Sequence, residues 1–291
     1  MSYFTSTIPE SNIELRHRLY SGEIFCIPAS SESIRLVDAC RVELVKALGD
    51  QGDYRLAQFR LTASEHFETV GKLRKQFYLE NRFQNLLARV VHSFGFSMNE
   101  NGFDAARLRT VNHDGHLAPA AAPLYYGHRD TWYANPESMI TWWLPLHDVE
   151  EAETFEFFPE EFSKSVPNDS EIFDFDEWIS IDQKKLIGWQ DQNTGLTARY
   201  PRLLEEPRSQ AVGIKCNAGD TLLFAGQHLH RTHKQTTGKT RFSLDFRTAH
   251  SLDTKNGVGP RNVDNRSRGS WHKKFLRFSS VMTEPDSTHE D

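Results

Sequence analysis

The sequence predicts an α+β fold in which a helical first third is followed by a mainly antiparallel sheet. Through the first hundred residues, apolar side chains recur at steps of three and four, which is the period of an amphipathic helix. From about residue 107 the chain turns to short runs rich in β-branched and aromatic residues, with no regular helix between them. Helices first and strands later favour an α+β architecture. A closed or flattened barrel is the natural form for so many short strands.

The helical third is expected to hold one early strand and two helices. Residues 23–28 form a short extended segment. A helix follows, capped by Ser31 or Ser33 and ended by Gly49, which tolerates the backbone angles of a helix C-terminus. A longer helix is predicted from about residue 64 to residue 93, because its apolar residues keep the helical spacing throughout.

Later segments are predicted as strands over residues 107–112, 138–146, 154–158, 211–215, 221–224 and 240–248. Residues 160–210 are polar and punctuated by prolines, which is typical of an insertion or lid that contacts substrate. We therefore expect a helical N-terminal region packed on the core, a β-rich catalytic core carrying this insertion, and a polar C-terminal tail, over residues 1–104, 105–250 and 251–291.

Composition narrows the classes of partner. The formal net charge is −6 and the pI is near 6.1, which argues against nucleic acid because phosphate binding needs a basic surface. The three cysteines, Cys26, Cys40 and Cys216, lie far apart without CxxC spacing. No signal peptide or membrane-length apolar run is visible. A cytoplasmic protein without a membrane partner is the simplest expectation.

A His-x-Asp motif carries the first functional signal. His128 and Asp130 are two positions apart, so an extended chain places them on the same face. A distant histidine can complete two imidazoles and one carboxylate on one side of a metal, leaving the other positions open. This facial set is typical of non-haem Fe(II) oxygenases. His228 and His230 share parity after the predicted strand 221–224, and both are candidates for the third ligand.

The strand over residues 240–248 alternates in character. Its polar face carries Arg241, Ser243, Asp245 and Arg247, and aromatic or aliphatic residues lie between them. One interpretation is an ordinary surface strand with its polar side in water. The other is a barrel wall whose polar face lines a cavity and whose apolar face packs outside. Arg241 then offers a fork for the distal carboxylate of 2-oxoglutarate, and the Ser243 hydroxyl adds a hydrogen bond.

Together, the His128-x-Asp130 pair, the segment 219–230 and the Arg241-x-Ser243 pair resemble the Fe(II)/2-oxoglutarate-dependent dioxygenases, most closely the phytanoyl-CoA dioxygenase-like superfamily. In that family His-x-Asp, a distal His and an Arg ten or eleven residues later recur on a double-stranded β-helix, a jelly-roll or cupin-like barrel. This spacing implies His230 as the third ligand. The family's Pro-Gly-Ser-His segment is missing after the wall strand, so phytanoyl-CoA itself is not implied. The presence of Asp130 argues against the halogenase variant.

The resemblance implies Fe(II), 2-oxoglutarate and O2 as cofactor and cosubstrates, with His128, Asp130 and His230 as the catalytic metal ligands. 2-Oxoglutarate is decarboxylated to succinate while an unactivated C–H bond is hydroxylated. Desaturation and ring formation are alternative outcomes. A polar small molecule is the expected substrate, and the candidate contacts are Arg109, Asn112, Tyr126, Trp143 and Arg247.

Two other classes of function are compatible with parts of this pattern. A cupin-type metal-dependent isomerase or hydrolase uses the same His, Asp and His, but it does not need the Arg241-x-Ser243 pair. A non-catalytic β-barrel binding protein would be marked by the loss of a ligand, and the sequence shows none lost.

Overall fold

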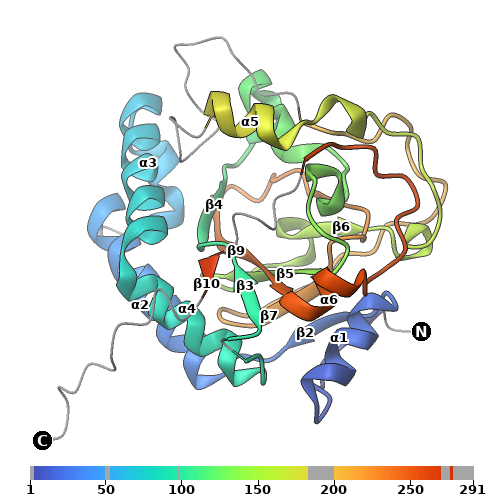
Figure 1. The fold of residues 1–291 in the computed structure, drawn as a ribbon. Coiled ribbons are helices and arrows are strands. Elements are labelled where there is room, and N and C mark those ends of the chain that lie inside the picture. The colour runs from blue at the N-terminus through green and yellow to red at the C-terminus, as the bar shows by residue number, and fades with distance from the viewer. Residues whose placement is uncertain (1–2, 50–52, 98, 183–199, 270–275, 278–291) are drawn as a thin grey trace, which may run out of the picture.

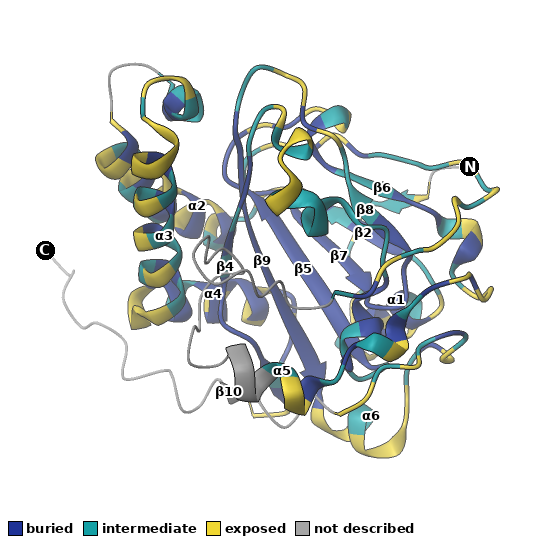
Figure 2. Cartoon of the chain, turned by 90° about the horizontal axis from the view of Figure 1, so that it is seen from above, coloured by how far each residue is buried: buried dark blue, intermediate teal, exposed yellow. Residues whose placement is uncertain are grey.

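The computed structural model describes residues 3–49, 53–97, 99–182, 200–269 and 276–277. Over these residues the chain folds into one large sheet, with a layer of helices on one face and a small second sheet with long loops on the other (Figure 1, Figure 2). This is the mixed helix-and-sheet architecture that the sequence predicts. Within the described part of the chain, no helix has the length and apolar character needed to cross a membrane.

The described helices are α1 Asn12–Tyr20, α2 Ser31–Leu48, α3 Ala63–Leu79, α4 Asn81–Ser93, α5 Phe175–Asp182 and α6 Ser251–Asn256. The strands are β1 Phe4–Thr5, β2 Ile24–Ile27, β3 Asn101–Phe103, β4 Arg107–Val111, β5 Met139–Pro145, β6 Phe155–Phe157, β7 Thr221–Ala225, β8 His230–Thr232, β9 Arg241–His250 and β10 Leu276–Arg277.

The large sheet has eight strands in the order β1-β2-β7-β5-β9-β3-β10, with β4 also paired to β9. Its pairs are antiparallel apart from β1 and β2. β9 is long enough to pair with β5 on one side and with both β4 and β3 on the other. Strands β1, β2 and β3 come from residues 1–104, so the predicted helical region also contributes to the sheet.

The two faces of β9 follow the alternation read from the sequence. Phe242, Leu244 and Phe246 belong to the main core, which also contains the buried residues of α2, α3 and α4. Arg241 and Ser243 point to the other side and are buried as well. The surface-strand interpretation is therefore wrong, because the polar side of the strand faces the protein interior.

Trp142 lies at the centre of the core between the sheet and the helices. Its ring stacks on Phe246 at 5.4 Å and meets Phe94 and Phe96 edge-on at 5.1 and 5.2 Å between ring centroids. Its indole N–H donates to the Thr248 hydroxyl at 2.9 Å. Each such aromatic pair adds about 0.5–1.5 kcal/mol beyond simple burial, so this cluster anchors the helical layer to β5 and β9.

The helix predicted over residues 64–93 is in fact two helices, α3 and α4, separated at Glu80. Glu80 has an extended backbone (φ −76°, ψ 125°). The apolar spacing changes here, because Phe77 and Phe83 are six positions apart and cannot share one helical stripe. Buried Gln84 seals the break by donating to the carbonyl oxygens of Phe77 and Tyr78 at 2.9 and 3.0 Å.

Other local predictions also need correction. The N-cap of α2 is Ser30, and Ser33 is its partner in a capping box. Residues 211–215 form no strand; Val212 makes an isolated bridge to Phe157, and Cys216, just after this segment, makes one to Val149. α1 and β8 were not predicted, since α1 carries few apolar residues and β8 has only three residues.

The predicted insertion and tail are described in part. Residues 160–182 and 200–210 form loops, short 3-10 turns and α5. Residues 183–199 of the predicted insertion, and residues 270–275 and 278–291 of the predicted tail, lie outside the described residues. After α6, residues 258–268 run back over the loops on the side of the sheet opposite the main helices (Figure 1, Figure 2).

Candidate metal centre

Three side chains from distant parts of the chain meet above the polar face of the sheet. Ligand atoms of His128, Asp130 and His230 all lie within 4.8 Å of one another. His128 Nε2 is 3.5 Å from Asp130 Oδ1, and the two imidazole centroids are 4.5 Å apart. No second cluster of three potential ligands was found in the described part of the chain. The structure therefore groups the three residues that the sequence motif singled out.

The backbone fixes both imidazoles in one orientation. His128 Nδ1 is 2.9 Å from the carbonyl oxygen of Tyr126, and His230 Nδ1 is 3.0 Å from that of His228. A carbonyl oxygen only accepts, so each Nδ1 carries a proton and Nε2 is the ring nitrogen that is left to bind a metal. Such an outer contact on the second ring nitrogen is the usual way in which a metal-binding histidine is oriented.

Asp130 is held as a carboxylate. The Thr141 hydroxyl donates to Oδ2, and Arg247 Nη2 lies 3.6 Å from Oδ1. Burial opposes the charge, but Arg247 and the two histidines outweigh it and hold the pKa of Asp130 well below its usual range. The group is thus ready to act as an anionic ligand at neutral pH.

His228 lies apart from this group. Its side chain is fully buried beside the Phe162 ring, with centroids 4.5 Å apart. Burial lowers the pKa of His228 to about 3 and that of His230 to about 4, so both are neutral at pH 7. Of the two candidates, only His230 joins the cluster.

A buried ion-pair network extends from Asp130 along β9. Arg247 lies 3.3 Å from Asp104 Oδ2 and 3.8 Å from Asp245 Oδ2, and Asp104 Oδ1 also accepts from the Arg247 backbone N–H. Asp245 is held from its other side by two bonds from Arg109, of 2.9 and 2.8 Å. Two of the predicted substrate contacts, Arg109 and Arg247, thus lie beside the cluster but are paired to carboxylates.

The predicted cosubstrate residues form a second site on the same face. Arg241 Nε and Nη1 and the Ser243 hydroxyl are buried, and none has a hydrogen-bond partner among the described residues. The guanidinium lies 5.6 Å from the Trp143 ring centroid and 5.5 Å from that of Phe155. Burial lowers the pKa of Arg241 to about 10, which still leaves the group charged at pH 7.

A buried cation without an anionic partner is costly, and so is a buried hydroxyl without a hydrogen bond. The Tyr125 hydroxyl is a third such group near Arg241, since it is buried and has no hydrogen-bond partner among the described residues. Donors of this kind fit one bound carboxylate, which can accept from all of them.

The remaining predicted contacts have more ordinary surroundings. Asn112 accepts from the Thr240 hydroxyl at 3.3 Å, and no described contact joins it to the cluster. The half-buried ring of Tyr126 lies 5.5 Å from the Arg202 guanidinium. Trp143 is buried in an apolar cluster with Phe157 and Phe224, so it forms a wall of the Arg241 site.

Sequence reasoning missed Thr141 and Tyr133. Thr141 is two residues before Trp143, so the parity of the predicted strand could have placed it on the polar face. Tyr133 is half-buried with its ring 5.4 Å from His128, between the cluster and Phe173 and Tyr200 of the insertion. No local pattern predicts those contacts.

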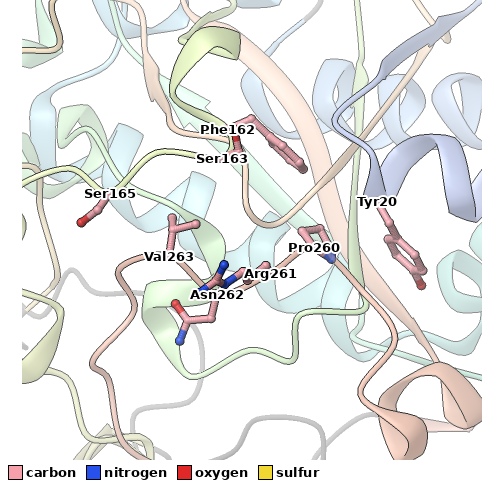
Figure 3. Close-up of a pocket in the computed structure, with 8 residues that line it drawn as sticks. All are labelled: Tyr20, Phe162, Ser163, Ser165, Pro260, Arg261, Asn262 and Val263. Carbon is pink, nitrogen blue, oxygen red and sulfur yellow. The ribbon is translucent and has the colours of Figure 1, made fainter.

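A separate pocket lies at the surface, between Tyr20 of α1 and the segments 162–165 and 260–263 (Figure 3). Its lining contains none of the three clustered ligands and no residue of the Arg241 site. This pocket is therefore distinct from the buried cluster.

No protein-family model matches the sequence, and no curated protein does. The structure is similar to those of EvdO2 from Micromonospora carbonacea var. aurantiaca (13% identity, TM-score 0.43, 89% of this chain and 100% of that chain) and apo HygX from Streptomyces hygroscopicus (13%, 0.41, 92% and 100%). It is also similar to the non-haem α-ketoglutarate-dependent epimerase SnoN from nogalamycin biosynthesis (13%, 0.41, 82% and 84%). These likenesses are distant, so we base the function on the side chains of the centre.

Proposed function

We propose that this protein is an Fe(II)- and 2-oxoglutarate-dependent oxygenase, built on a double-stranded β-helix, that hydroxylates an unactivated C–H bond of a polar small molecule. The observation that carries the proposal is a facial set of ligands beside a buried guanidinium that lacks a hydrogen-bonded anion. Two imidazoles and a carboxylate fit Fe(II) and leave positions open. The unpaired Arg241 and Ser243 fit a carboxylate, and the Phe155 ring lies 5.5 Å from the Arg241 guanidinium and 5.6 Å from the His230 ring.

Bound together, Fe(II), 2-oxoglutarate and O2 supply the oxidising chemistry, in which one oxygen atom enters the substrate C–H bond while the other enters succinate and CO2 is released. His128, Asp130 and His230 would hold the metal on one side. Arg241 and Ser243 would hold the far carboxylate of the cosubstrate and so orient its other end toward the metal. The apolar wall of Trp143 and Phe155 excludes water from this ion pair and strengthens it.

The proposal that the substrate is a polar small molecule rests on the surroundings of Arg109, Asp245 and Arg247. The charges of Arg109 and Arg247 are balanced by Asp245 and Asp104, and Arg247 Nε is a buried donor without a hydrogen-bond partner among the described residues. This setting suits a polar small molecule. The net charge of −6 also favours a small-molecule substrate over nucleic acid.

A cupin-type isomerase or hydrolase could use the same three ligands. It has no use for a buried arginine that lacks a hydrogen-bonded carboxylate, and such a group is costly unless an anion binds to it. The arginine is therefore the feature that favours the oxygenase.

The test is succinate formation by protein loaded anaerobically with Fe(II) and then given 2-oxoglutarate and O2. We expect slow turnover without substrate in the wild type, and none in His128→Ala or Arg241→Ala. In the absence of O2, the wild type should show the visible charge-transfer band of 2-oxoglutarate chelated to Fe(II), and both variants should lose it. Wild-type protein with neither succinate nor this band would overturn the proposal.

A further inference from the structure

Arg129 lies between the two ligands of the His-x-Asp motif and points into the protein. On an extended segment its side chain projects opposite to those of His128 and Asp130, and it is fully buried. The guanidinium donates to backbone carbonyl oxygens of three residues, Gln227, Glu161 and Lys164. Arg129 therefore ties the ligand loop, by which we mean residues 128–134, to the turn before β8 and to the segment after β6.

Asp264 completes this set of contacts from a distant part of the chain. Its Oδ2 accepts from Arg129 Nε at 3.1 Å and from the Val166 backbone N–H at 3.0 Å, and its Oδ1 accepts from the Trp132 indole at 2.8 Å. Its carbonyl oxygen accepts from Asn168 at 3.2 Å. Both Asp264 and Arg129 are buried, so each bond forms away from water.

The contacts of Asp264 flank one ligand. Arg129 precedes Asp130 by one residue and Trp132 follows it by two, so a single carboxylate fixes the chain on both sides of Asp130. Nothing in the sequence motif indicates this partner, which lies 134 positions beyond Asp130 (264 − 130).

Asp264 belongs to a segment, residues 260–268, that we call the C-terminal strap. Ser267 Oγ accepts from the Ala134 backbone N–H at 3.0 Å, which is a further bond to the ligand loop. Arg268 pairs through its backbone with Phe173 and Phe175. Figure 3 shows residues 260–263 of the strap beside Phe162 and Ser163, across the pocket from Tyr20.

We propose that Asp264 is a positioning residue for the metal centre, and that the C-terminal strap sets the affinity for the metal by holding the ligand loop through Arg129 and Trp132. This inference rests on the proposed function, since it takes the His128 cluster to be a metal site. It extends that function by making the centre depend on a segment outside the predicted catalytic core of residues 105–250.

The physical reason is preorganisation. A ligand that must be ordered when the metal arrives costs affinity, and outer contacts that order it in advance avoid that cost. Replacing Asp264 by Asn keeps the shape but removes the charge and places a donor where Arg129 and Val166 also donate. The loop then loses its fixed position, although all three ligands are still present.

The experiment compares wild type, Asp264→Asn and Asp253→Asn in the full chain, with Co(II) as the probe. Asp253 forms a less deeply buried ion pair with Arg16 at 2.7 Å, and its described contacts do not include residues 128–132. Co(II) affinity is measured by equilibrium dialysis, the ligand field by visible absorption, and the stability of metal-free protein by urea unfolding. We expect Asp264→Asn to bind Co(II) about 10–100-fold more weakly with an altered spectrum. Asp253→Asn should keep both wild-type values even where it unfolds at lower urea.

If Asp264→Asn does not fold, Arg129→Lys decides the matter. Lys keeps the charge but cannot make all four bonds of the guanidinium, so a loss of affinity is again expected. Wild-type affinity and spectrum in either folded variant would overturn the inference and leave the proposed function standing. A wild type that does not bind Co(II) would overturn both.

Discussion

The backbones of His128 and His230 hydrogen-bond to each other in both directions, with N···O distances of 2.9 and 3.0 Å. The two residues are far apart in sequence, yet this bridge sets their side chains next to each other on the same side of the local pair. Side chains of successive residues on β8 point to opposite sides. The bridge at His230 therefore turns the His230 side chain, and not that of the next residue, toward His128.

The first prediction separates His230 from His228. His230→Ala removes a ligand of the proposed centre, so the Kd for Co(II) should rise by at least about 100-fold, more than the loss of an outer contact causes. His228→Phe suits a site already surrounded by Phe157, Phe162 and Phe224 and should keep wild-type affinity. Equilibrium dialysis of both variants provides the measurement. The opposite ranking would mean that His228 is the ligand.

The second prediction concerns two threonines on opposite faces of the sheet. Thr141→Val removes the hydroxyl that donates to Asp130, so metal affinity should fall about 10-fold or more. Thr110→Val makes the same change at a buried hydroxyl that has no hydrogen-bond partner among the described residues. That variant should leave metal affinity unchanged and stability equal or higher. Equal effects of the two changes on Co(II) affinity would show that the Thr141 bond has no special role.

Features that depend on residues close in sequence could be predicted. The alternation of Arg241, Phe242, Ser243 and Leu244 predicted both the strand and its two faces, because side chains alternate strictly along a strand. His128 and Asp130 could be paired for the same reason. The break at Glu80 was not predicted, because the similar composition on both sides concealed the six-residue step from Phe77 to Phe83, which does not fit one helical stripe.

Features that depend on tertiary contacts could not be predicted. Asp264 lies in a polar segment whose composition matches a solvated tail, and only the fold brings it to Arg129. Asp104 follows β3 and gains its role by bonding to Arg247 where β3 and β4 meet along β9. In each case a buried carboxylate pairs with an arginine that is far away in the sequence. Local sequence patterns carry no information on such pairs.

The third prediction concerns the free-energy cost of keeping Arg241, a cation without a hydrogen-bonded anion, in the protein interior. Arg241→Met removes that charge and retains much of the side-chain volume, so metal-free protein should become more stable by at least about 1 kcal/mol. The same variant should lose 2-oxoglutarate binding, because the anion no longer has its partner. Urea unfolding and calorimetric titration with 2-oxoglutarate measure the two effects.

Ser243→Ala is the matched, smaller change on the same strand. We expect a stability equal to or above that of wild type and a Kd for 2-oxoglutarate raised by about 10-fold, which corresponds to one hydrogen bond to a charged group. A purely structural Arg241 would give the reverse pattern for Arg241→Met, with lower stability and intact binding. That result would contradict the assignment of the anion site.

The fourth prediction is a dependence of folding stability on pH that comes from His147. Its Nε2 accepts from the Phe242 backbone N–H at 3.0 Å, so the folded state requires the neutral ring. Burial is the main cause that lowers the pKa of His147 to about 4, against 6.5 for the ordinary group. Between these values the unfolded chain holds a proton that the folded protein excludes. Stability should therefore be full above pH 6.5 and should fall as the pH drops toward 4, by about 3 kcal/mol for this group.

His147→Gln tests this by replacing the titrating ring with a group that can still accept a hydrogen bond. Urea unfolding of chelator-treated protein should show a wild-type stability that declines more steeply below pH 6.5 than that of the variant, since the variant lacks one of the protons taken up on unfolding. His228 and His230 also have lowered pKa values and remain in both proteins, so they contribute equally and cancel in the difference. Parallel curves would mean that His147 accepts a proton in the folded state as readily as in the unfolded chain, and that its bond to Phe242 does not hold the ring neutral.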